Sequence, residues 1–530
     1  MKQIQGRYTK HTLAIAVLMA IGGTAHAAVD GWGFSEQNAR STALQSGYMN
    51  LVDSYNVWVN PALVVKNSNH VDVRITDDGT RDEDSAGAYK TWGDNTFGAY
   101  LGRPSGSLLE LVNGSDFNSL RTYGVTRNGE NVPAAPAVDN PRNQFDLFFG
   151  MGSLPTVNLG ARLNFQAITN THDLPVYTSQ TPNVFQTTDT TRTTDSVATN
   201  DTDTSARELN LAFGVADKNG LWDATLLLGR PSSTSKAALA DQRMTETLVA
   251  GAYTARTVND FDGTQKDSSS GARNIGIAAR LLNPIPNSIA TFMYQNQNYS
   301  HSNKINATVR ARSDVNVIGT TDAGDTDTTT SYAESGKFKL KDNLFSLWFT
   351  QNFMPAANSL VIATVGLSKV RSENSTVNTV TANSTVNNLN STATYNNAPF
   401  ASLGTQTNSS EKYESTMLPL ILGFESQVTG STTLRAAVRK NLYQSTTVRS
   451  TTETWELPVS ATSANATTKI NTVTKKDKTT SVWDTDTTLT LGAGYKVDSF
   501  VIDAVLQKEF VTAGTDNGLV SRVNVTYLLP

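Results

Sequence analysis

The chain has 530 residues, no cysteine, a formal net charge of −4 and 17% charged residues. This charged fraction lies well below the about 25% usual in soluble globular proteins, which disfavours a charge-coated cytosolic enzyme. The near balance of acids and bases gives no basic surface for nucleic acid, so we expect no nucleic-acid partner. Without cysteine the chain forms no disulfide and no thiolate metal site, which suits a protein that crosses an oxidising compartment.

The first 27 residues have the three parts of a secretory signal peptide. Basic residues precede an apolar run from Leu13 to Ile21, and small residues at Ala25 and Ala27 flank a cleavage signature. The apolar run is too short for a membrane helix, which needs about 20 residues. We therefore expect 1–27 to be removed and the mature chain to be exported through the periplasm.

Apolar and polar residues alternate along several segments of the mature chain. In 157–165 the odd positions are Val, Leu, Ala, Leu and Phe, whereas the even positions are Asn, Gly, Arg and Asn. Similar alternation recurs in 209–215, 275–281 and 522–527. A period of two is typical of β-strands with one apolar and one polar face. Because no stretch after the signal is long and apolar enough for a membrane helix, a closed β-barrel is the structure that satisfies the backbone in lipid.

The connections between these segments alternate in length. Short ones with turn residues fall at 152–156, 216–220, 283–287, 354–358, 429–431 and 496–498. Long tracts rich in Thr, Ser, Asn and Asp fall at 178–206, 232–270, 301–334, 372–413 and 446–480. Short periplasmic turns and long extracellular loops are typical of outer-membrane barrels, so we predict that the long tracts are extracellular loops.

This pattern predicts sixteen strands: 62–76, 92–102, 106–113, 142–151, 157–168, 207–215, 221–231, 271–283, 288–300, 335–351, 358–370, 413–427, 432–446, 481–495, 499–510 and 519–529. The segment 106–113 is the weakest, and without it an even count leaves fourteen. The predicted fold is all-β, a transmembrane antiparallel β-barrel at 61–530 preceded by a short plug-like segment at 28–60. An exported soluble β-sandwich or solenoid is the alternative, because the alternation is weak in any one strand.

The start of the mature chain differs from the rest. Residues 33–65 read GFSEQNARSTALQSGYMNLVDSYNVWVNPALVV, small and polar at first and ending near an Asn-Pro-Ala tripeptide. This stretch resembles the N-terminal plug of FadL-type outer-membrane transporters of long-chain fatty acids and other hydrophobic compounds. The residues that carry the likeness are Gly33, Phe34, Glu36, Gln37, Ala39, Asn60, Pro61, Ala62 and Leu63. The resemblance implies a plugged barrel in a Gram-negative outer membrane, whereas by itself the tripeptide is an Asn-Pro turn that opens the first strand.

The polar parity of the strands identifies residues that face the lumen of a barrel. They include arginines and acids, namely Arg74, Arg162, Arg280, Arg435, Arg439, Arg522, Asp72, Asp223 and Asp503. A buried guanidinium is costly unless it is solvated or paired, so either a water-filled lumen or ion pairs across it are required. Such arginines would favour anions in a diffusion pore, anchor a carboxylate in a FadL-like transporter, or pair with the lumen acids to hold the barrel.

No pattern in the chain supports catalysis, and we expect no enzyme, no cofactor and no bound metal. The histidines of the mature chain, His70, His172 and His301, are far apart and belong to no zinc, hydrolase or phosphate-binding motif. We predict passive passage of solutes through an outer-membrane barrel, with outer-membrane lipid and a hydrophobic or anionic amphipathic solute as partners. A homo-oligomer is compatible with this prediction. A surface structural or adhesive barrel without an open pore is the alternative function.

Overall fold

The structure is a computed structural model that describes residues 39–45, 50–76, 85–102, 143–173, 177–181, 191–249, 252–315, 326–388, 400–457, 469–480, 484–507 and 522–529. The described helices are all short: α2 Ala39–Ala43, η3 Ser54–Val57 and η4 Pro61–Val65. Among the described residues, no helix has the length and apolar character needed to cross a membrane. The signal peptide predicted at 1–27 and the strand predicted at 106–113 lie outside the described residues.

The strands differ widely in length. The short ones are β1 His70–Thr76, β2 Ser85–Trp92, β3 Asn95–Leu101, β4 Asn143–Met151, β6 Tyr177–Thr181, β17 Phe500–Gln507 and β18 Arg522–Leu528. The longer ones are β5 Val157–Asp173, β7 Thr191–Asp217, β8 Trp222–Val249, β9 Ala252–Leu282, β10 Ser288–Val315, β11 Thr326–Ala356, β12 Ser359–Asn388, β13 Phe400–Gln427, β14 Thr432–Leu457, β15 Lys469–Thr480 and β16 Asp484–Val497.

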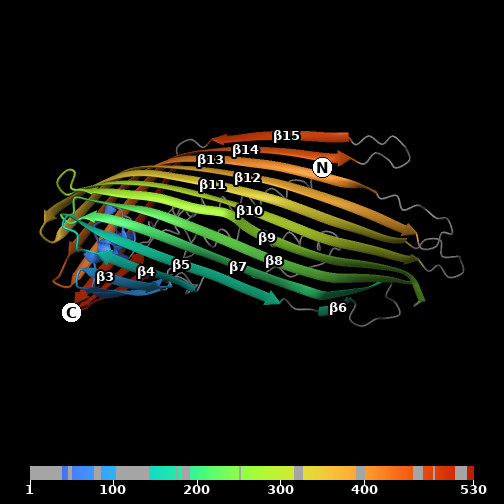
Figure 1. Ribbon diagram of the computed structural model, residues 1–530, viewed down its shortest axis with the longest axis horizontal. Helices are drawn as coiled ribbons and strands as arrows, with labels where there is room; N and C mark the ends of the chain where they lie inside the picture. Colours follow the sequence, from blue (N-terminus) through green and yellow to red (C-terminus); the bar gives the residue numbers. More distant parts are fainter. Residues whose placement is uncertain are drawn as a thin grey trace.

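The described strands form one antiparallel sheet that closes on itself, because β1 pairs with both β2 and β18 (Figure 1). β5 and β6 follow one another along β7, and β15 and β16 follow one another along β14. Counting each of these two pairs as one strand reduces the eighteen segments to sixteen strands. The predicted antiparallel barrel of sixteen strands is therefore confirmed.

The predicted strand positions were wrong at the start of the barrel. The strand expected at 62–76 begins at His70, and the residues before it form the helix η4. Asn60 caps this helix by accepting a hydrogen bond from the backbone N–H of Ala62, and Pro61 fits the first helical position. The strand β2 was missed altogether. It joins β3 through a two-residue turn at Gly93, whose φ of +60° suits glycine.

The tracts predicted as extracellular loops are largely strand, so that prediction was wrong. β9 and β11 each have 31 residues, which is about 100 Å of extended chain at ~3.3 Å per residue. Threonine is β-branched and favours strands even where the alternation of hydrophobicity fades. Hydroxyl side chains also bond across these strands, as Ser268 and Ser302 do at 3.0 Å. Strands β7 to β14 consequently project far beyond the short β1 to β4 (Figure 1).

The short connections were predicted correctly. All six fall where consecutive strands meet, although 216–217, 354–356 and 496–497 still belong to β7, β11 and β16. They gather at one end of the barrel, which we call the turn end (Figure 1). Asn283, Asn287 and Asp498 adopt positive φ values of 60°, 62° and 49° in these turns. Asn and Asp tolerate this left-handed conformation better than most residues.

Candidate functional site

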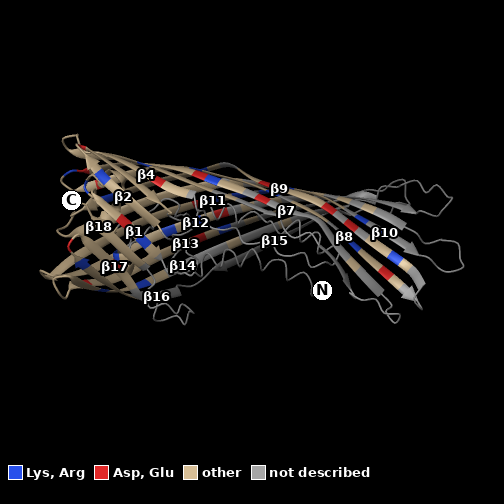
Figure 2. Cartoon of the chain, turned by 90° about the horizontal axis from the view of Figure 1, so that it is seen from below, with Lys and Arg blue, Asp and Glu red and all other residues tan. Residues whose placement is uncertain are grey.

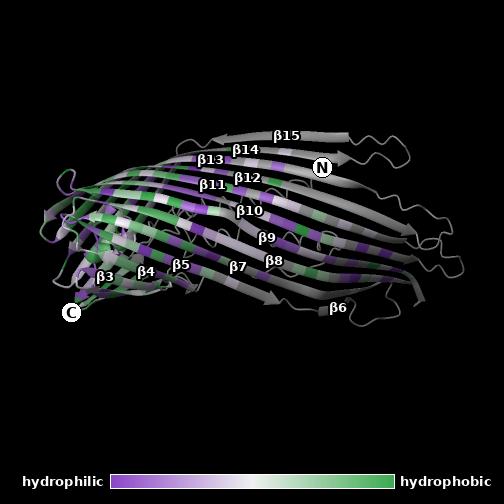
Figure 3. Cartoon of the chain, viewed as in Figure 1, coloured by the Kyte–Doolittle hydropathy of each residue, from purple (hydrophilic) through white to green (hydrophobic). Residues whose placement is uncertain are grey.

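The outward face of the strands near the turn end is apolar (Figure 3). On β7, Leu209, Leu211 and Phe213 are exposed, whereas the intervening Asn210 and Ala212 are buried. The apolar outward face and the inward face that the alternation predicts for this strand are therefore both present in the structure. The inward face at this end meets a segment of the same chain.

Residues 39–45 and 50–66, which we call the luminal segment, lie inside the barrel at the turn end (Figure 1). The helix α2 contacts β14, β16, β17 and β18, whereas η4 contacts β3, β4, β5 and β7. Since these two groups of strands belong to different parts of the wall, the segment crosses the lumen. It overlaps the range 28–60 predicted as plug-like and continues to Lys66.

Three neighbouring glycines let the luminal segment approach the wall. Gly150, Gly160 and Gly214 are register partners on β4, β5 and β7. A Cβ at Gly160 would overlap the backbone of η4, and one at Gly214 would overlap the side chain of Asn60. The helix thus lies directly on the sheet backbone, where a side chain on the wall would displace it.

Arg280 ties the luminal segment to an acid of the wall. Its guanidinium donates to Asp223 on the adjacent strand, with Nη2 to Oδ2 at 2.8 Å, and both side chains are buried. Its Nη1 also donates to the carbonyl oxygen of Leu51 at 3.3 Å. Asn60 reaches the same carboxylate, its Nδ2 lying 3.4 Å from Asp223 Oδ1. The ion pair therefore joins two points of the segment to β8 and β9.

Arg162 makes a second attachment. Its Nη1 donates to the carbonyl oxygen of Trp58 at 3.2 Å, and its guanidinium carbon lies 5.6 Å from the centre of the indole ring. Its Nε is 3.9 Å from the carboxylate of Asp146. Trp58 packs edge-on against Tyr100 and Phe148, with ring centres 4.9 and 5.0 Å apart. Cation, ring and carboxylate thus stabilise the same buried corner.

A third attachment is a network of five charged side chains. Arg435 contacts Glu425 and Asp503, with both N to O distances at 2.6 Å. Arg40 of the luminal segment donates to the same Glu425 at 2.9 Å and lies 3.6 Å from Asp53. Burial by itself lowers the pKa of the Arg40 guanidinium, but the hydrogen bond and charge of Glu425 outweigh burial and raise that pKa above its ordinary value. Arg40 is therefore held as a cation in this network.

The remaining predicted lumen residues take no part in these three attachments, although Asp72 also forms a side-chain hydrogen bond with Tyr55 of the luminal segment. Arg74 and Asp72 are buried on β1, where Asp72 accepts hydrogen bonds from Tyr100 at 2.8 Å and Thr526 at 3.1 Å. Arg439 donates to Asn441 at 2.8 Å on its own strand. The side chain of Arg522 lies outside the described residues.

A band of amide side chains further along the lumen wall was missed by the sequence analysis. Gln166 and Asn274 donate to the two oxygens of Glu208 at 2.7 and 3.2 Å, and Asn210 donates to Asn164 at 3.0 Å. All five residues are buried and have the inward parity. Inward parity was the signal that could have identified all five, including the charged Glu208.

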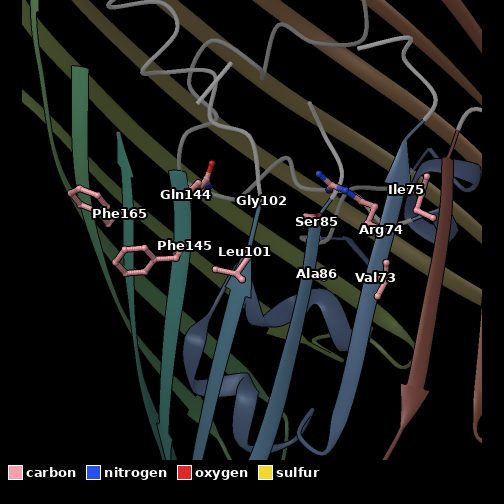
Figure 4. Close-up of a pocket in the computed structure, with 10 residues that line it drawn as sticks. All are labelled: Val73, Arg74, Ile75, Ser85, Ala86, Leu101, Gly102, Gln144, Phe145 and Phe165. Atoms are coloured by element: carbon pink, nitrogen blue, oxygen red, sulfur yellow. The ribbon is translucent and has the colours of Figure 1, made fainter. Parts of the chain in front are cut away.

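A pocket of 660 Å³ lies where β1 to β5 leave the turn end (Figure 4). Its lining combines buried polar residues with apolar ones: Val73, Arg74, Ile75, Ser85, Ala86, Leu101, Gly102, Gln144, Phe145 and Phe165. Gln144 is 3% exposed, and within the described chain neither atom of its amide has a hydrogen-bond partner. A buried amide without a hydrogen-bond partner is suited to form hydrogen bonds with a polar group of a ligand.

Within the described ranges, no group of three His, Asp or Glu side chains is placed to hold a metal ion. His70 is buried with its ring 4.9 Å from that of Tyr89. The other two histidines of the mature chain lie on β5 and β10, and their side chains are outside the described set.

No protein family and no curated protein matches the chain. Among solved structures, it is similar to the FrpB iron transporter from Neisseria meningitidis, with 9% identity over 90% of this chain and 83% of that one and a TM-score of 0.23. It is also similar to the ferric enterobactin receptor PfeA from Pseudomonas aeruginosa, with 10% identity over 87% and 80% of the two chains and a TM-score of 0.22. Likeness at this level supports no argument about family or function. No FadL-type protein is among these matches, so that resemblance stays a prediction.

Proposed function

We propose that this chain is an outer-membrane β-barrel through which solutes pass passively, with the luminal segment as its plug. Three features support the proposal together: a closed sheet, an apolar outward belt and a polar interior. A soluble barrel or sandwich that left so many large apolar side chains exposed would aggregate. In a bilayer the same side chains contact lipid, and closure leaves no sheet edge unpaired there.

The pocket at β1 to β5 is the observation that supports a particular class of solute. The guanidinium of Arg74 and the amide of Gln144 provide donors on its lumen side, whereas Val73, Ile75 and Leu101 provide apolar surface. An anionic amphipathic compound matches both sides, with its acid group near the donors and its chain along the apolar residues. This chemistry is the finer part of the proposal.

In this mechanism the luminal segment controls passage. The segment is attached through Arg162, Arg280 and Arg435, each of which contacts a carboxylate of the wall. Arg162 and Arg280 also donate to backbone oxygens of the segment, whereas Arg435 shares Glu425 with Arg40 of the segment. Water that enters the lumen weakens each ion pair by screening it. Local release at one attachment then opens a path beside the segment while the other attachments keep it in place.

The alternative is a surface barrel that holds a structure outside the cell without an open pore. Its supporting observation is the length of β7 to β14, at 26 to 31 residues each. About 9–11 residues per strand suffice to cross a bilayer. The projecting sheet is therefore available for a role that passage through the lumen does not need.

Conductance and uptake by reconstituted protein distinguish the two functions. We compare the full mature chain with a variant that lacks residues 39–55, and use Gly430→Ala, at a turn where a Cβ meets no atom within 4 Å, as the control. A plug predicts higher conductance after the deletion, and an amphiphile transporter predicts uptake of a fluorescent fatty acid by the full chain. Absence of conductance and of uptake in both proteins would favour the surface barrel.

A further inference from the structure

Basic residues border the apolar belt on the side away from the turn end. On five strands the outward residue that follows the apolar run is exposed and basic: Arg207 on β7, Arg230 on β8, Arg273 on β9, Lys369 on β12 and Lys440 on β14. Charged residues continue along β8 and β10 beyond this border (Figure 2). The outward surface thus changes from apolar to cationic at one level of the barrel.

Three lysines form a row just beyond the border. Lys236 on β8, Lys266 on β9 and Lys304 on β10 are register partners, and all three side chains are exposed. Adjacent strands lie about 4.8 Å apart, so each lysine sits beside another like charge. Like charges directly opposite destabilise a sheet. The register partner of Lys236 on its other side is Asp203, an exposed acid on β7.

β11 extends the same surface. Lys337, Lys339 and Lys341 are exposed at alternate positions, and therefore point outward together. Their register partners on β10 are Ser302, Ser300 and Asn298. We call the three lysines of the row and the three of β11 the basic patch. It is a cationic surface with hydroxyl and amide groups between the charges, and its acidic register neighbours are Asp203 beside Lys236 and Glu373 beside Lys341.

On the neighbouring strands β12 and β13, basic side chains form ion pairs with acids. Arg371 on β12 lies 2.7 Å from Glu373 and 3.6 Å from Glu414 on β13. Lys412 lies 3.4 Å from the same Glu373. No lysine of the basic patch makes a comparable ion pair with another described residue. An anion from outside the chain would supply the missing countercharge.

The level of the row indicates the source of that anion. Lys236 lies fourteen residues beyond Trp222, where β8 begins at the turn end. At ~3.3 Å per residue and a tilt of about 40°, this places it about 35 Å along the barrel axis. The apolar band of such barrels is about 25 Å tall, so the row lies about 10 Å beyond it. Short turns mark the periplasmic side, and the row therefore faces the headgroups of the outer leaflet.

We propose that the basic patch binds the phosphate groups of an anionic glycolipid in the outer leaflet. Each ammonium offers three donors to phosphate oxygens, and the serine hydroxyls between the lysines suit the sugar groups that carry the phosphates. The bound phosphates also remove the repulsion within the lysine row. This inference rests on the membrane placement in the proposed function but is independent of whether the lumen conducts.

Binding of lipopolysaccharide to the purified full-length protein tests the proposal. The variant Lys236→Gln/Lys266→Gln/Lys304→Gln removes the row, and Arg371→Gln/Lys412→Gln removes two basic residues whose charges are already paired. We expect the first variant to bind lipopolysaccharide at least about tenfold more weakly, and the second to bind like the unaltered protein. Dephosphorylated lipopolysaccharide should bind poorly to all three. Equal affinity of the row variant and the unaltered protein, or equal losses in both variants, would overturn the site.

Two further measurements separate the possible failures. Inorganic phosphate at millimolar concentration should not displace the lipid, and full displacement would indicate a general anion site and overturn the lipid assignment. Vesicle flotation of the unaltered protein reports membrane insertion. A protein that does not float with vesicles contradicts the proposed function and this inference together, whereas one that floats but binds lipid through other residues contradicts this inference alone.

Discussion

The side chain of Asn60 occupies the space above Gly214 where a Cβ would lie. From this position its amide nitrogen donates to the backbone oxygens of Val215 at 2.9 Å and Ala224 at 3.1 Å. Its oxygen accepts from the backbone of η4. One asparagine therefore caps a helix of the luminal segment and fixes that helix to β7 and β8.

Replacing Gly214 by Val should dislodge this attachment. The new side chain overlaps Asn60, so we expect η4 to shift from the wall at a cost of about 1–3 kcal/mol in the free energy of unfolding. Urea unfolding of the refolded protein in vesicles measures that cost, and single-channel recording measures the accompanying rise in conductance. Gly430→Ala should change neither quantity. Normal stability and conductance in the Gly214 variant would show that η4 is not held where the structure places it.

Replacing Arg280 alone should lower the free energy of unfolding more than replacing both Arg280 and Asp223. Arg280→Met leaves the buried carboxylate of Asp223 without its cation, which costs about 3–5 kcal/mol in the free energy of unfolding. Arg280→Met combined with Asp223→Leu should recover much of the loss, because no buried charge then remains unpaired. Urea unfolding of both variants in vesicles measures the difference. Additive losses in the double variant would mean that the two residues do not depend on each other.

An exposed ion pair provides the matched comparison for that cycle. Arg371→Met disrupts contacts with Glu373 and Glu414 where the side chain of Arg371 is 49% exposed. Exposed pairs contribute about 0–1 kcal/mol, so we expect a small change in unfolding free energy. A loss as large as that of Arg280→Met would show that burial does not set the cost.

The barrel was predictable because its signal depends on short-range alternation. The parity of Leu209, Leu211 and Phe213 is enough to predict that they share one face of their strand. The six short turns predict which strands are neighbours. The lengths of the strands were not predictable in this way. Beyond the belt both faces are polar, so hydrophobicity no longer alternates, and threonine-rich strands such as β7 and β14 resemble loops in sequence.

The candidate site was predictable in part. Parity predicted that Arg162, Arg280, Arg435, Asp223 and Asp503 face inward, and in the structure Arg280 contacts Asp223 and Arg435 contacts Asp503. Which carbonyl or acid each arginine meets depends on the path of the luminal segment, which has no periodic signal. Arg40 and Glu425, 385 residues apart, meet only because the segment returns to β13.

The outward belt makes a prediction about lipid contact. Leu211→Arg should cost about 2–4 kcal/mol if the site lies near the bilayer midplane, and should reduce assembly into the membrane. Ser205→Arg, six residues further on the same exposed face of β7, lies beyond the apolar run and should be tolerated. Heat-modifiable gel mobility of the membrane fraction measures assembly. Similar assembly of the two variants would mean that lipid does not cover Leu211.

The orientation of the barrel is testable because the chain has no cysteine, so a single introduced thiol has no background. Thr308→Cys places a thiol on an exposed outward position of β10 far from the turn end, and Ile285→Cys places one in the turn before β10, where Ile285 is 55% exposed. Short turns of outer-membrane barrels lie in the periplasm, so a maleimide too large to cross the outer membrane should label intact cells at 308 and not at 285. Both sites should react after the cells are broken, which shows that each thiol is accessible in the folded protein. Labelling at 285 alone on intact cells would mean that the barrel has the opposite orientation, with the basic patch on the periplasmic side of the membrane.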